Sequence, residues 1–327
     1  MNSNPCRCSR STQSLHRAQT ALSVDWLFAA VILAGCLLSA PLQSQNLRGD
    51  EALVKVLVEG EPWQLMAQGY KFTDAACADA EGNFYFADVA AGNSINRIDP
   101  AGRVSELITH TPRISGLKFG PDGRIYACTQ NPKKQVVAFT LPEGTLTVLA
   151  DDVQPNDLVV SRKGNVYFTE TGKGQVTLID TNGHVRAVAT GINAPNGIGL
   201  SPDHGMLAVS EYVGSNVWVY RINGDGTLSG GDRYMELRTP VGSSRSEGDG
   251  MTVDADGRYY VTSAVGIQMF DWTGRLSGVI ARPQPKGTVS VALAGPELSY
   301  LYACSSDKVY RRKLKVKGGP NPLSGVR

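Results

Sequence analysis

The segment "NDLVVSRKGNVYFTE" (156–170) decides the fold, because its pattern returns at regular intervals along this chain of 327 residues. An apolar stretch is followed by a tight turn containing glycine, and an alternating strand comes next. The second half of the pattern occurs six times, in residues 81–88, 122–129, 163–170, 204–211, 256–263 and 298–305. The last residues of these segments are 41, 41, 41, 52 and 42 residues apart, so the chain is built from internal repeats.

Four strands are predicted in each repeat. After the alternating strand, a third strand ends in a turn such as "IDPAG" (98–102) or "IDTNG" (179–183), and a fourth strand leads to the next repeat. No stretch shows sustained helical periodicity. Six repeats of four strands predict an all-β fold, a six-bladed β-propeller with four-stranded blades, over residues 50–316.

The two ends of the propeller differ from the regular repeats. The sixth repeat is one strand short, and a missing strand would leave an unpaired edge. The apolar segment "ALVKVLVEG" (52–60) precedes the first repeat and is predicted to be the N-terminal strand that closes the ring. Residues 317–327 are rich in Gly and Pro and are predicted to form a flexible C-terminal tail.

The composition is that of a globular protein, with 42% hydrophobic and 19% charged residues and a formal net charge of +2. Beyond residue 44 the acidic and basic residues balance, and no basic stripe is present, which argues against a nucleic-acid partner. We expect a monomer. Cys77, Cys128 and Cys304 fall in apolar strand patterns without metal-site or disulfide spacing, and are predicted to be small buried side chains.

Residues 1–44 are predicted to be an export signal. Three arginines precede the apolar run 26–38, which is short for a membrane span and is followed by polar residues. Within it, "LAGC" (Leu33–Cys36) resembles a bacterial lipoprotein cleavage box, with Cys36 as the lipid anchor. Ordinary cleavage near residues 40–44 is the alternative. Either interpretation predicts a periplasmic or extracellular protein, and the first predicts a membrane-anchored lipoprotein.

In the first five repeats, one residue carries a side-chain oxygen eight residues before the turn glycine (nine in the fourth repeat), and the sixth repeat has a serine at the same phase. These residues are Asp74, Ser115, Asn156, Asn196, Asp249 and Ser290. In a propeller the first strand of each blade lines the central channel, so we expect these oxygens to form a ring at one mouth. A lone Asp or Asn at a strand start often caps a turn, but turn chemistry does not require such phasing.

The second strand of each blade runs back to the same mouth. Its end residues are Asp88, Thr129, Glu170, Glu211, Ser263 and Ser305. Carboxylate and amide oxygens without thiolate or imidazole suit a hard divalent cation. Ca²⁺ is favoured over Mg²⁺, and Zn²⁺ or Mn²⁺ are further candidates, because six or more oxygens at flexible distances suit calcium best.

Three segments carry a resemblance to a known family. They are "PNDLVVSRKGNVYFTE" (155–170), "APNGIGLSPD" (194–203) and "EGDGMTVDADGRYYVTS" (247–263). The chain resembles the senescence marker protein, gluconolactonase and luciferin-regenerating enzyme family, whose members are six-bladed propellers with one divalent metal in the channel. The resemblance implies that Asn196 and Asp249 are metal ligands, that Asp249 is also the general base, and that Asn156 binds metal or substrate.

Two positions depart from the family pattern. The family has Glu in an "EGP" motif of the first blade, and here the matching triplet is "DAA" (74–76), with Asp74 as a shorter ligand. Some members also place Arg two residues before the Asn of "PND", where this chain has Gln154. The resemblance therefore implies the metal quartet Asp74, Asn156, Asn196 and Asp249, with sugar specificity less secure than the fold.

The resulting hypothesis is a divalent-metal-dependent hydrolase of small lactones. The cation would polarise the lactone carbonyl, and Asp249 would activate water. Gln130, Asn156, Glu170 and Glu211 are predicted to orient the substrate. No G-x-S-x-G motif is present and no His falls at the mouth positions, which disfavours a serine hydrolase. The alternative is a non-catalytic exported propeller that binds a sugar or peptide at the same mouth, and in either case residues 235–246 would form a lid.

Overall fold

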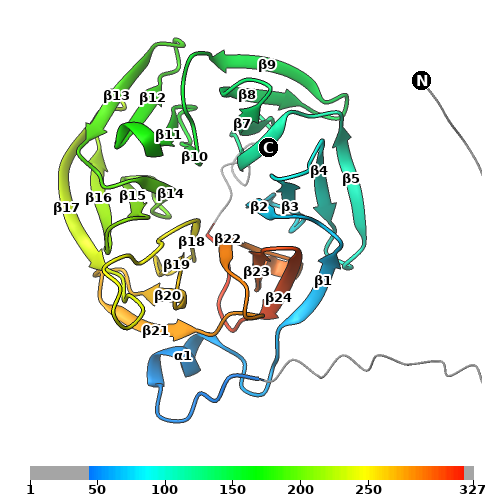
Figure 1. The fold of residues 1–327 in the computed structure, drawn as a ribbon, viewed down its shortest axis with the longest axis vertical. Coiled ribbons are helices and arrows are strands. Elements are labelled where there is room, and N and C mark those ends of the chain that lie inside the picture. The colour runs from blue at the N-terminus through cyan, green and yellow to red at the C-terminus, as the bar shows by residue number, and fades with distance from the viewer. Residues whose placement is uncertain (1–43, 320–327) are drawn as a thin grey trace, which may run out of the picture. The chain divides into compact units, whose positions relative to one another are not determined.

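The computed structural model describes residues 44–319. Six four-stranded antiparallel sheets surround a central axis, as Figure 1 shows. This confirms the predicted six-bladed β-propeller. The predicted export signal and lipid anchor lie outside the described residues, as does the tail from residue 320. Within the described residues, no helix has the length and apolarity needed to cross a membrane.

The blades follow one another along the chain, each with its innermost strand first. Blades one to three consist of β2 (Thr73–Ala78), β3 (Phe84–Asp88), β4 (Ser94–Ile98), β5 (Val104–Thr109); β6 (Arg113–Phe119), β7 (Ile125–Asn131), β8 (Gln135–Thr140), β9 (Thr145–Ala150); and β10 (Leu158–Val160), β11 (Val166–Glu170), β12 (Gln175–Ile179), β13 (Val185–Thr190). Blades four to six consist of β14 (Pro195–Leu200), β15 (Met206–Glu211), β16 (Asn216–Ile222), β17 (Leu228–Glu236); β18 (Met251–Val253), β19 (Tyr259–Ser263), β20 (Gly266–Phe270), β21 (Leu276–Ile280); and β22 (Thr288–Ala294), β23 (Tyr300–Ser305), β24 (Lys308–Lys313), β1 (Gln64–Gln68). Short 3₁₀ turns lie at Thr171–Lys173 and Pro296–Leu298.

An N-terminal strand closes the ring, but it is not the predicted one. The closing strand is β1, which pairs antiparallel with β24 and places Leu65 opposite Tyr310. Residues 52–60 were the wrong choice, because Glu51–Val56 form the helix α1. Blade six is thus completed from both ends of the propeller, and its outer edge is paired.

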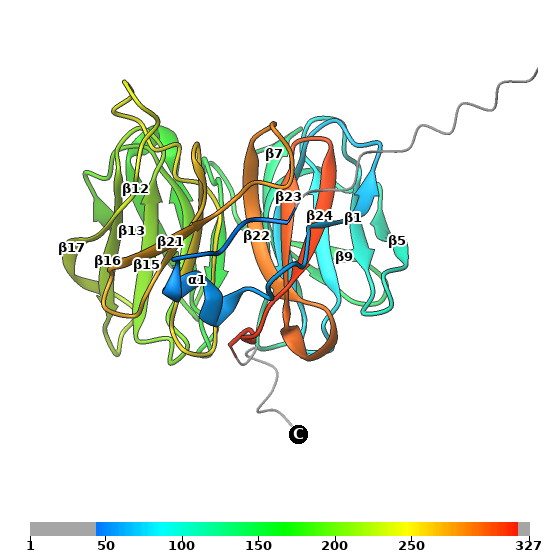
Figure 2. The ribbon, with the colours of Figure 1, turned by 90° about the horizontal axis from the view of Figure 1, so that it is seen from below.

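The sequence of α1 contains helix signals that the strand prediction missed. Asp50 caps the helix, because its side chain accepts a hydrogen bond from the N–H of Leu53 at 3.0 Å. Leu53, Val56 and Leu57 are spaced as one face of a helix and are fully buried. The helix lies beside β21 (Figure 2). It therefore covers the edge of blade five instead of joining a sheet.

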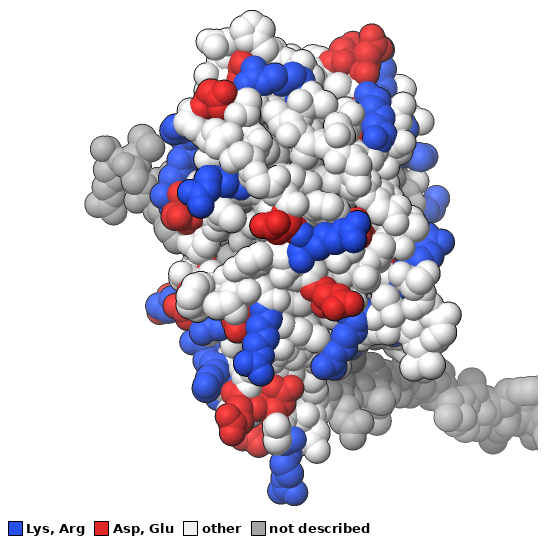
Figure 3. All heavy atoms as spheres, turned by 90° about the vertical axis from the view of Figure 1, so that its left-hand side faces the viewer, with Lys and Arg blue, Asp and Glu red and all other residues white. Residues whose placement is uncertain are grey.

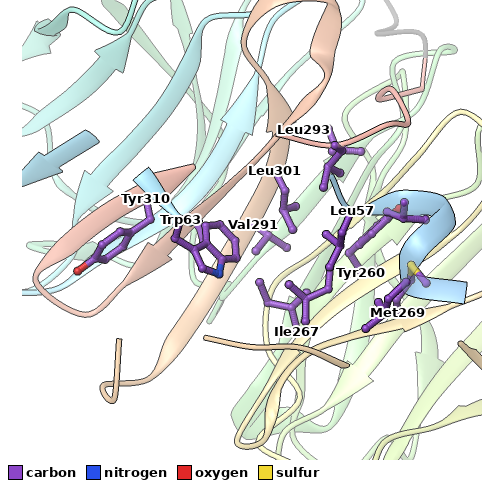
Figure 4. Close-up of a cluster of buried hydrophobic side chains, with 14 of the residues drawn as sticks. Leu57, Trp63, Tyr260, Ile267, Met269, Val291, Leu293, Leu301 and Tyr310 are labelled. Atoms are coloured by element: carbon purple, nitrogen blue, oxygen red, sulfur yellow. The ribbon is translucent and has the colours of Figure 1, made fainter. Parts of the chain in front are cut away.

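The hydrophobic core is divided into clusters that fill the spaces between neighbouring blades. Figure 4 shows the cluster between blades five and six, where Tyr260 and Met269 face Val291 and Leu301. Trp63 joins this cluster, and its indole N–H donates to the carbonyl oxygen of Ala281 at 2.9 Å. Each blade is therefore stabilised mainly by apolar contact with its two neighbours. Cys77, Cys128 and Cys304 are buried in such clusters, as predicted.

The C-terminal segment lies at one end of the channel, the end at which tight turns join the first and second strands. We call this end the turn mouth. Gly318 pairs with Asp254 in an isolated β-bridge, and its N–H donates to Leu298. The predicted tail, 317–327, therefore begins with residues that are bonded to blades five and six. Figure 2 shows this segment on the opposite side from the long loop 237–250.

The outer surface shows interspersed charges. On the side formed by the outer strands of blades three and four, Lys and Arg alternate with Asp and Glu (Figure 3). Arg186 and His184 both approach Asp180 there, at 3.4 and 3.2 Å. This face of the described residues therefore has no continuous stripe of one charge.

Candidate metal and substrate site

The six predicted ring residues lie at the same end of the inner strands, and we call this end of the channel the oxygen mouth. Asp74, Asn196 and Ser290 lie within β2, β14 and β22, while Asn156 and Asp249 come just before β10 and β18. The antiparallel pairing places them level with the ends of the second strands. The predicted ring thus exists as a feature of the backbone.

Hydrogen bonds between blades hold the backbone of the ring. The hydroxyl of Thr169 donates to the carbonyl oxygen of Asn196 at 2.7 Å, and that of Ser210 donates to Asp249 at 3.0 Å. The thiol of Cys304 lies 3.8 Å from the carbonyl oxygen of Asp74. Each donor lies one residue before the end of a second strand. These residues fix the positions of ring residues in the next blade, a role that their places in the sequence did not reveal.

Small residues follow the ring residues because neighbouring inner strands approach closely. A Cβ atom on Gly197 would overlap the carbonyl group of Asp249. A Cβ atom on Gly250 would lie 2.8 Å from the carbonyl oxygen of Val289. The "PNG" and "GDG" motifs are therefore packing requirements as well as ligand motifs.

The side chains of the predicted quartet make few contacts with other protein groups. Asp74 accepts one hydrogen bond, from the N–H of Ala75 at 2.7 Å, and Asp249 accepts one, from the N–H of Gly250 at 3.0 Å. Within residues 44–319, the side-chain amides of Asn156 and Asn196 form no hydrogen bond with another residue, and neither amide is sealed from solvent. Polar side chains of this kind, partly enclosed and with few protein partners, are available to bind water or a ligand.

The carboxylates of the mouth are electrostatically unfavourable without a cation. Burial raises the pKa of Asp74 to about 7, and the charge of Asp157 adds to this effect. Burial, together with the charges of Asp74 and Asp157, raises the pKa of Asp249 well above its usual range. The enclosed carboxylates thus destabilise each other's ionised forms, and positive charge at this mouth would relieve the repulsion.

Two charged residues of the channel were not predicted. Asp157 occupies the place where blades two, four and five have glycine, and its buried carboxylate accepts a hydrogen bond from the N–H of Leu158 at 2.8 Å. Lys118 extends from β6, and its ammonium group donates to the carbonyl oxygen of Ala76 at 3.3 Å. Both residues interrupt otherwise small or apolar patterns, and that interruption was the available signal.

Glu170 and Glu211, which were predicted to orient substrate, are bonded within their own blades. Both side chains are almost completely buried. Glu170 accepts hydrogen bonds from the N–H of Gln154 and the hydroxyl of Thr177, and it forms an ion pair with Lys173 at 2.7 Å. Burial alone would raise the pKa of Glu170, but the bonds from Lys173, Thr177 and Gln154 lower it below its usual range.

Glu211 has similar surroundings in blade four. It accepts hydrogen bonds from the indole N–H of Trp218 at 2.8 Å, from the amide of Asn216 at 2.9 Å and from the N–H of Asn193 at 3.3 Å. Asp88 in blade one accepts four backbone N–H bonds. These contacts give the acidic second-strand ends a clear role in holding loops, and they do not bring the carboxylates of Glu170 and Glu211 into the ring.

Gln130 and the long loop lie at the edge of the oxygen mouth. The amide of Gln130 donates to the hydroxyl of Ser115 at 2.8 Å and to the carbonyl oxygen of Pro155. Loop 237–250 begins where β17 ends at this mouth, and the buried hydroxyl of Ser246 anchors it to Gly214 at 2.8 Å. Arg245 stacks on Tyr212, with 5.7 Å between its guanidinium carbon and the ring centroid. The predicted lid, residues 235–246, thus begins in the last two residues of β17 and continues into this loop.

The donor set fits a hard divalent cation. Among the described residues, no three His, Cys, Asp or Glu side chains are grouped closely enough to hold a metal ion by themselves. The quartet Asp74, Asn156, Asn196 and Asp249 relies on amide oxygens for half of its ligands. Its sparse hydrogen bonding and mutual carboxylate repulsion are what a cation site requires before the cation binds.

These features define a class, a six-bladed propeller with a carboxylate and amide ring at one mouth of its channel. Residues 72–307 match the family described as the SMP-30/Gluconolactonase/LRE-like region. The chain belongs to this family, which confirms the resemblance seen in the sequence.

Two curated relatives have related names. A gluconolactonase of Zymomonas mobilis is 27% identical over 244 residues, which is 67% of this chain and 67% of the relative. The pentonolactonase XacC of Haloferax volcanii is 26% identical over 251 residues, which is 72% of this chain and 84% of the relative.

Solved structures share the fold. A gluconolactonase of Xanthomonas campestris superimposes with a TM-score of 0.70 at 20% identity, covering 83% of this chain and 94% of its own. Regucalcin of Agrobacterium tumefaciens, described as a calcium-binding protein, superimposes with a TM-score of 0.66 at 17% identity, covering 80% and 97%.

Proposed function

We propose that this protein is a hydrolase of small lactones, of the sugar-lactone kind, that works with a divalent cation at the oxygen mouth. The observation that carries the proposal is the set of sparsely bonded ring side chains. The chain belongs to the SMP-30/Gluconolactonase/LRE-like family, and two of its relatives are named gluconolactonase and pentonolactonase. Ca²⁺ is the first choice of cation, because the ligands are oxygens and a structural neighbour is described as calcium-binding.

The residues of the oxygen mouth would have different roles in lactone hydrolysis. Asp74, Asn196 and Asp249 would hold the cation, and Asn156 would bind the cation or a hydroxyl of the substrate. A bound cation would polarise the lactone carbonyl and favour the ionised carboxylates. One oxygen of Asp249 is bonded to the N–H of Gly250, which leaves lone pairs of the carboxylate both for the cation and for a proton from the attacking water.

The backbone is strained beside the shorter ligand of blade one. Ala75 takes the place of the glycine in the family's "EGP" motif and has a φ of 62°, a left-handed conformation that favours glycine. An alanine held in this conformation costs about 1 kcal/mol or more. Such strain beside Asp74 supports a functional role for the first-blade position.

A lactone panel tests the proposed function. The purified protein would be incubated with sugar γ- and δ-lactones, with and without chelator, and acid release would be followed by a pH indicator. We expect hydrolysis that is lost on chelation and restored by Ca²⁺ or another divalent cation. Cation binding without hydrolysis of any lactone would favour the non-catalytic alternative, a propeller that binds a sugar or peptide. Export to the periplasm or the medium is a separate prediction, which fractionation of cells would check.

A further inference from the structure

Lys118 is a lysine on the inner wall of the channel. It belongs to β6, the innermost strand of blade two, and its side chain is half-buried. Its ammonium group reaches the neighbouring blade and donates to the carbonyl oxygen of Ala76, two residues beyond Asp74. An ammonium group in an enclosed channel is costly unless nearby negative charge compensates it.

The compensating charges belong to the carboxylates of the oxygen mouth, which are those of Asp74, Asp157 and Asp249. The carboxylate of Asp157 lies beside Gly116, which is two residues before Lys118 in β6, because a Cβ atom on Gly116 would be 2.8 Å from Oδ1 of Asp157. Burial raises the pKa of both Asp74 and Asp157, and the positive charge of Lys118 opposes this rise. Asp249 interacts with the same two carboxylates. Glu247 also acts on Asp249, but its side chain is exposed, so solvent screens it. When ionised, the three enclosed carboxylates and one ammonium group carry a net charge of −2.

We propose that Lys118 is the fixed counter-charge of the channel, which leaves Asp74, Asp157 and Asp249 with the negative charge that one dication neutralises. This inference rests on the proposed cation site and adds the residue that sets its charge. By this account Lys118 weakens the binding of every cation, and it weakens trivalent ions more than divalent ions. The lysine thus favours a single dication that exchanges readily over a tightly held ion of higher charge.

The surroundings of Lys118 allow its charge to be removed. On its turn-mouth side, Lys118 lines a cavity of about 190 Å³ together with Phe119, Val159, Met251 and Leu293. A methionine at position 118 has a similar length and would lie against this partly apolar wall. Lys118→Met should therefore fold, and circular dichroism and thermal melting would confirm it.

The experiment compares metal affinities by calorimetry for the wild-type protein, Lys118→Met and Lys134→Met. Lys134 is exposed in the β7–β8 loop, so its substitution changes the net charge equally but not inside the channel. Each protein is titrated with Ca²⁺ and, separately, with Tb³⁺. We expect Lys118→Met to bind Ca²⁺ about tenfold more tightly. Because attraction scales with ionic charge, the same change should tighten Tb³⁺ binding about thirtyfold, while Lys134→Met should change either affinity less than about twofold.

The outcomes separate this inference from the proposed function. If the wild-type protein binds Ca²⁺ and Lys118→Met binds it no more tightly, the lysine is not the counter-charge, and the cation site stands. Equal gains for Ca²⁺ and Tb³⁺ would also overturn the inference, because a purely structural change would not depend on ionic charge. If only the variant binds cations, Lys118 compensates the carboxylates in place of a metal, and the metal-dependent function fails. If neither protein binds a cation, both proposals fail.

Discussion

The ring residues of the inner strands and the end residues of the second strands lie at the same mouth, yet their side chains have different surroundings. Asp249 and Asp74 each accept one hydrogen bond, whereas Glu170 and Glu211 each accept several. The pKa values of the two aspartates are raised and that of Glu170 is lowered. The number of donors around each buried carboxylate therefore distinguishes the two sets of acidic residues, and it is the reason for proposing the aspartates as cation ligands.

The largest expected effect is on catalysis at the ring. Asp249→Asn keeps the size of the side chain but removes its charge and its ability to accept a proton. We expect kcat/KM for a hydrolysed lactone to fall about 10³-fold, with the fold intact. Steady-state kinetics on the best substrate of the panel would measure it. A variant that keeps more than a tenth of the activity would show that Asp249 is neither the base nor a necessary ligand.

The next effect tests the backbone beneath the ring. Gly197→Ala would place a Cβ atom on the carbonyl group of Asp249, so the two inner strands must separate. We expect a loss of about 3 kcal/mol in the free energy of unfolding and an activity loss of about 10²-fold from displacement of Asp249. Gly224→Ala is the matched control, because no atom lies near its added Cβ. Similar melting curves for both variants would mean that the inner strands are not tightly packed at the ring.

The third effect concerns the second-strand ends. Glu211→Gln replaces one acceptor oxygen by an NH₂ group, which faces donors from Asn216 or Trp218. We expect the free energy of unfolding to fall by about 2 kcal/mol because a buried donor loses its partner. Lactonase activity of the folded enzyme should stay within a few-fold of wild type. A loss of activity comparable to that of Asp249→Asn, without loss of stability, would restore Glu211 as a substrate ligand.

A smaller effect is expected in the stability of the chelated protein as a function of pH. The pKa of Asp74 is raised to about 7 in the folded state, above the unfolded value of 3.8. The stability linked to this group is therefore complete below the unfolded pKa and is lost as the pH rises through about 7. Thermal melting in chelator should give a lower Tm at pH 8 than at pH 5, by a few degrees.

Two controls sharpen the pH measurement. In Asp74→Asn, the fall in Tm between pH 5 and pH 8 should be smaller. In the wild-type protein, millimolar Ca²⁺ should raise the Tm at pH 8. The stability contribution of Glu170 depends on pH in the opposite direction. Because the pKa of Glu170 is lowered, its contribution disappears as the pH falls through the acidic range. A Tm in chelator that rises steadily from pH 5 to pH 8 would contradict the enclosed carboxylates described at the oxygen mouth.

The propeller could be predicted from the sequence because the order of strands and turns is local and recurs in every repeat. The ring was predictable for the same reason, since each member has a fixed offset from its turn. The hydrogen bonds of Glu170 and Glu211 were not predictable, because their donors come from residues such as Asn193 and Trp218 in neighbouring loops and strands. The charge of Lys118 in the channel also needed the structure, because β6 alone does not show which carboxylates its side chain meets.

The position of the closing strand was predicted wrongly for a different reason. Residues 52–60 are as apolar as a strand, and only the spacing of Leu53, Val56 and Leu57, with Asp50 as a cap, distinguishes the helix. The true closing strand, Gln64–Gln68, is short and half-exposed, because an outermost strand packs on one side only. Its pattern is therefore too weak to be chosen over the more apolar helix, although the need for a strand in this region was correct.

The smallest predicted effect concerns strain beside the ring. Ala75 is left-handed at φ 62°, and Ala194 and Glu247 are also left-handed, two residues before Asn196 and Asp249. Ala75→Gly should raise the free energy of unfolding by up to about 1 kcal/mol, because glycine adopts this conformation without strain. Ala76→Gly is the control and should lower it by a similar amount, since Ala76 has no such strain. If denaturant titration shows that both variants are destabilised, the backbone of the ring is not strained at Ala75, and the contrast with the relaxed second-strand ends would rest on hydrogen bonding alone.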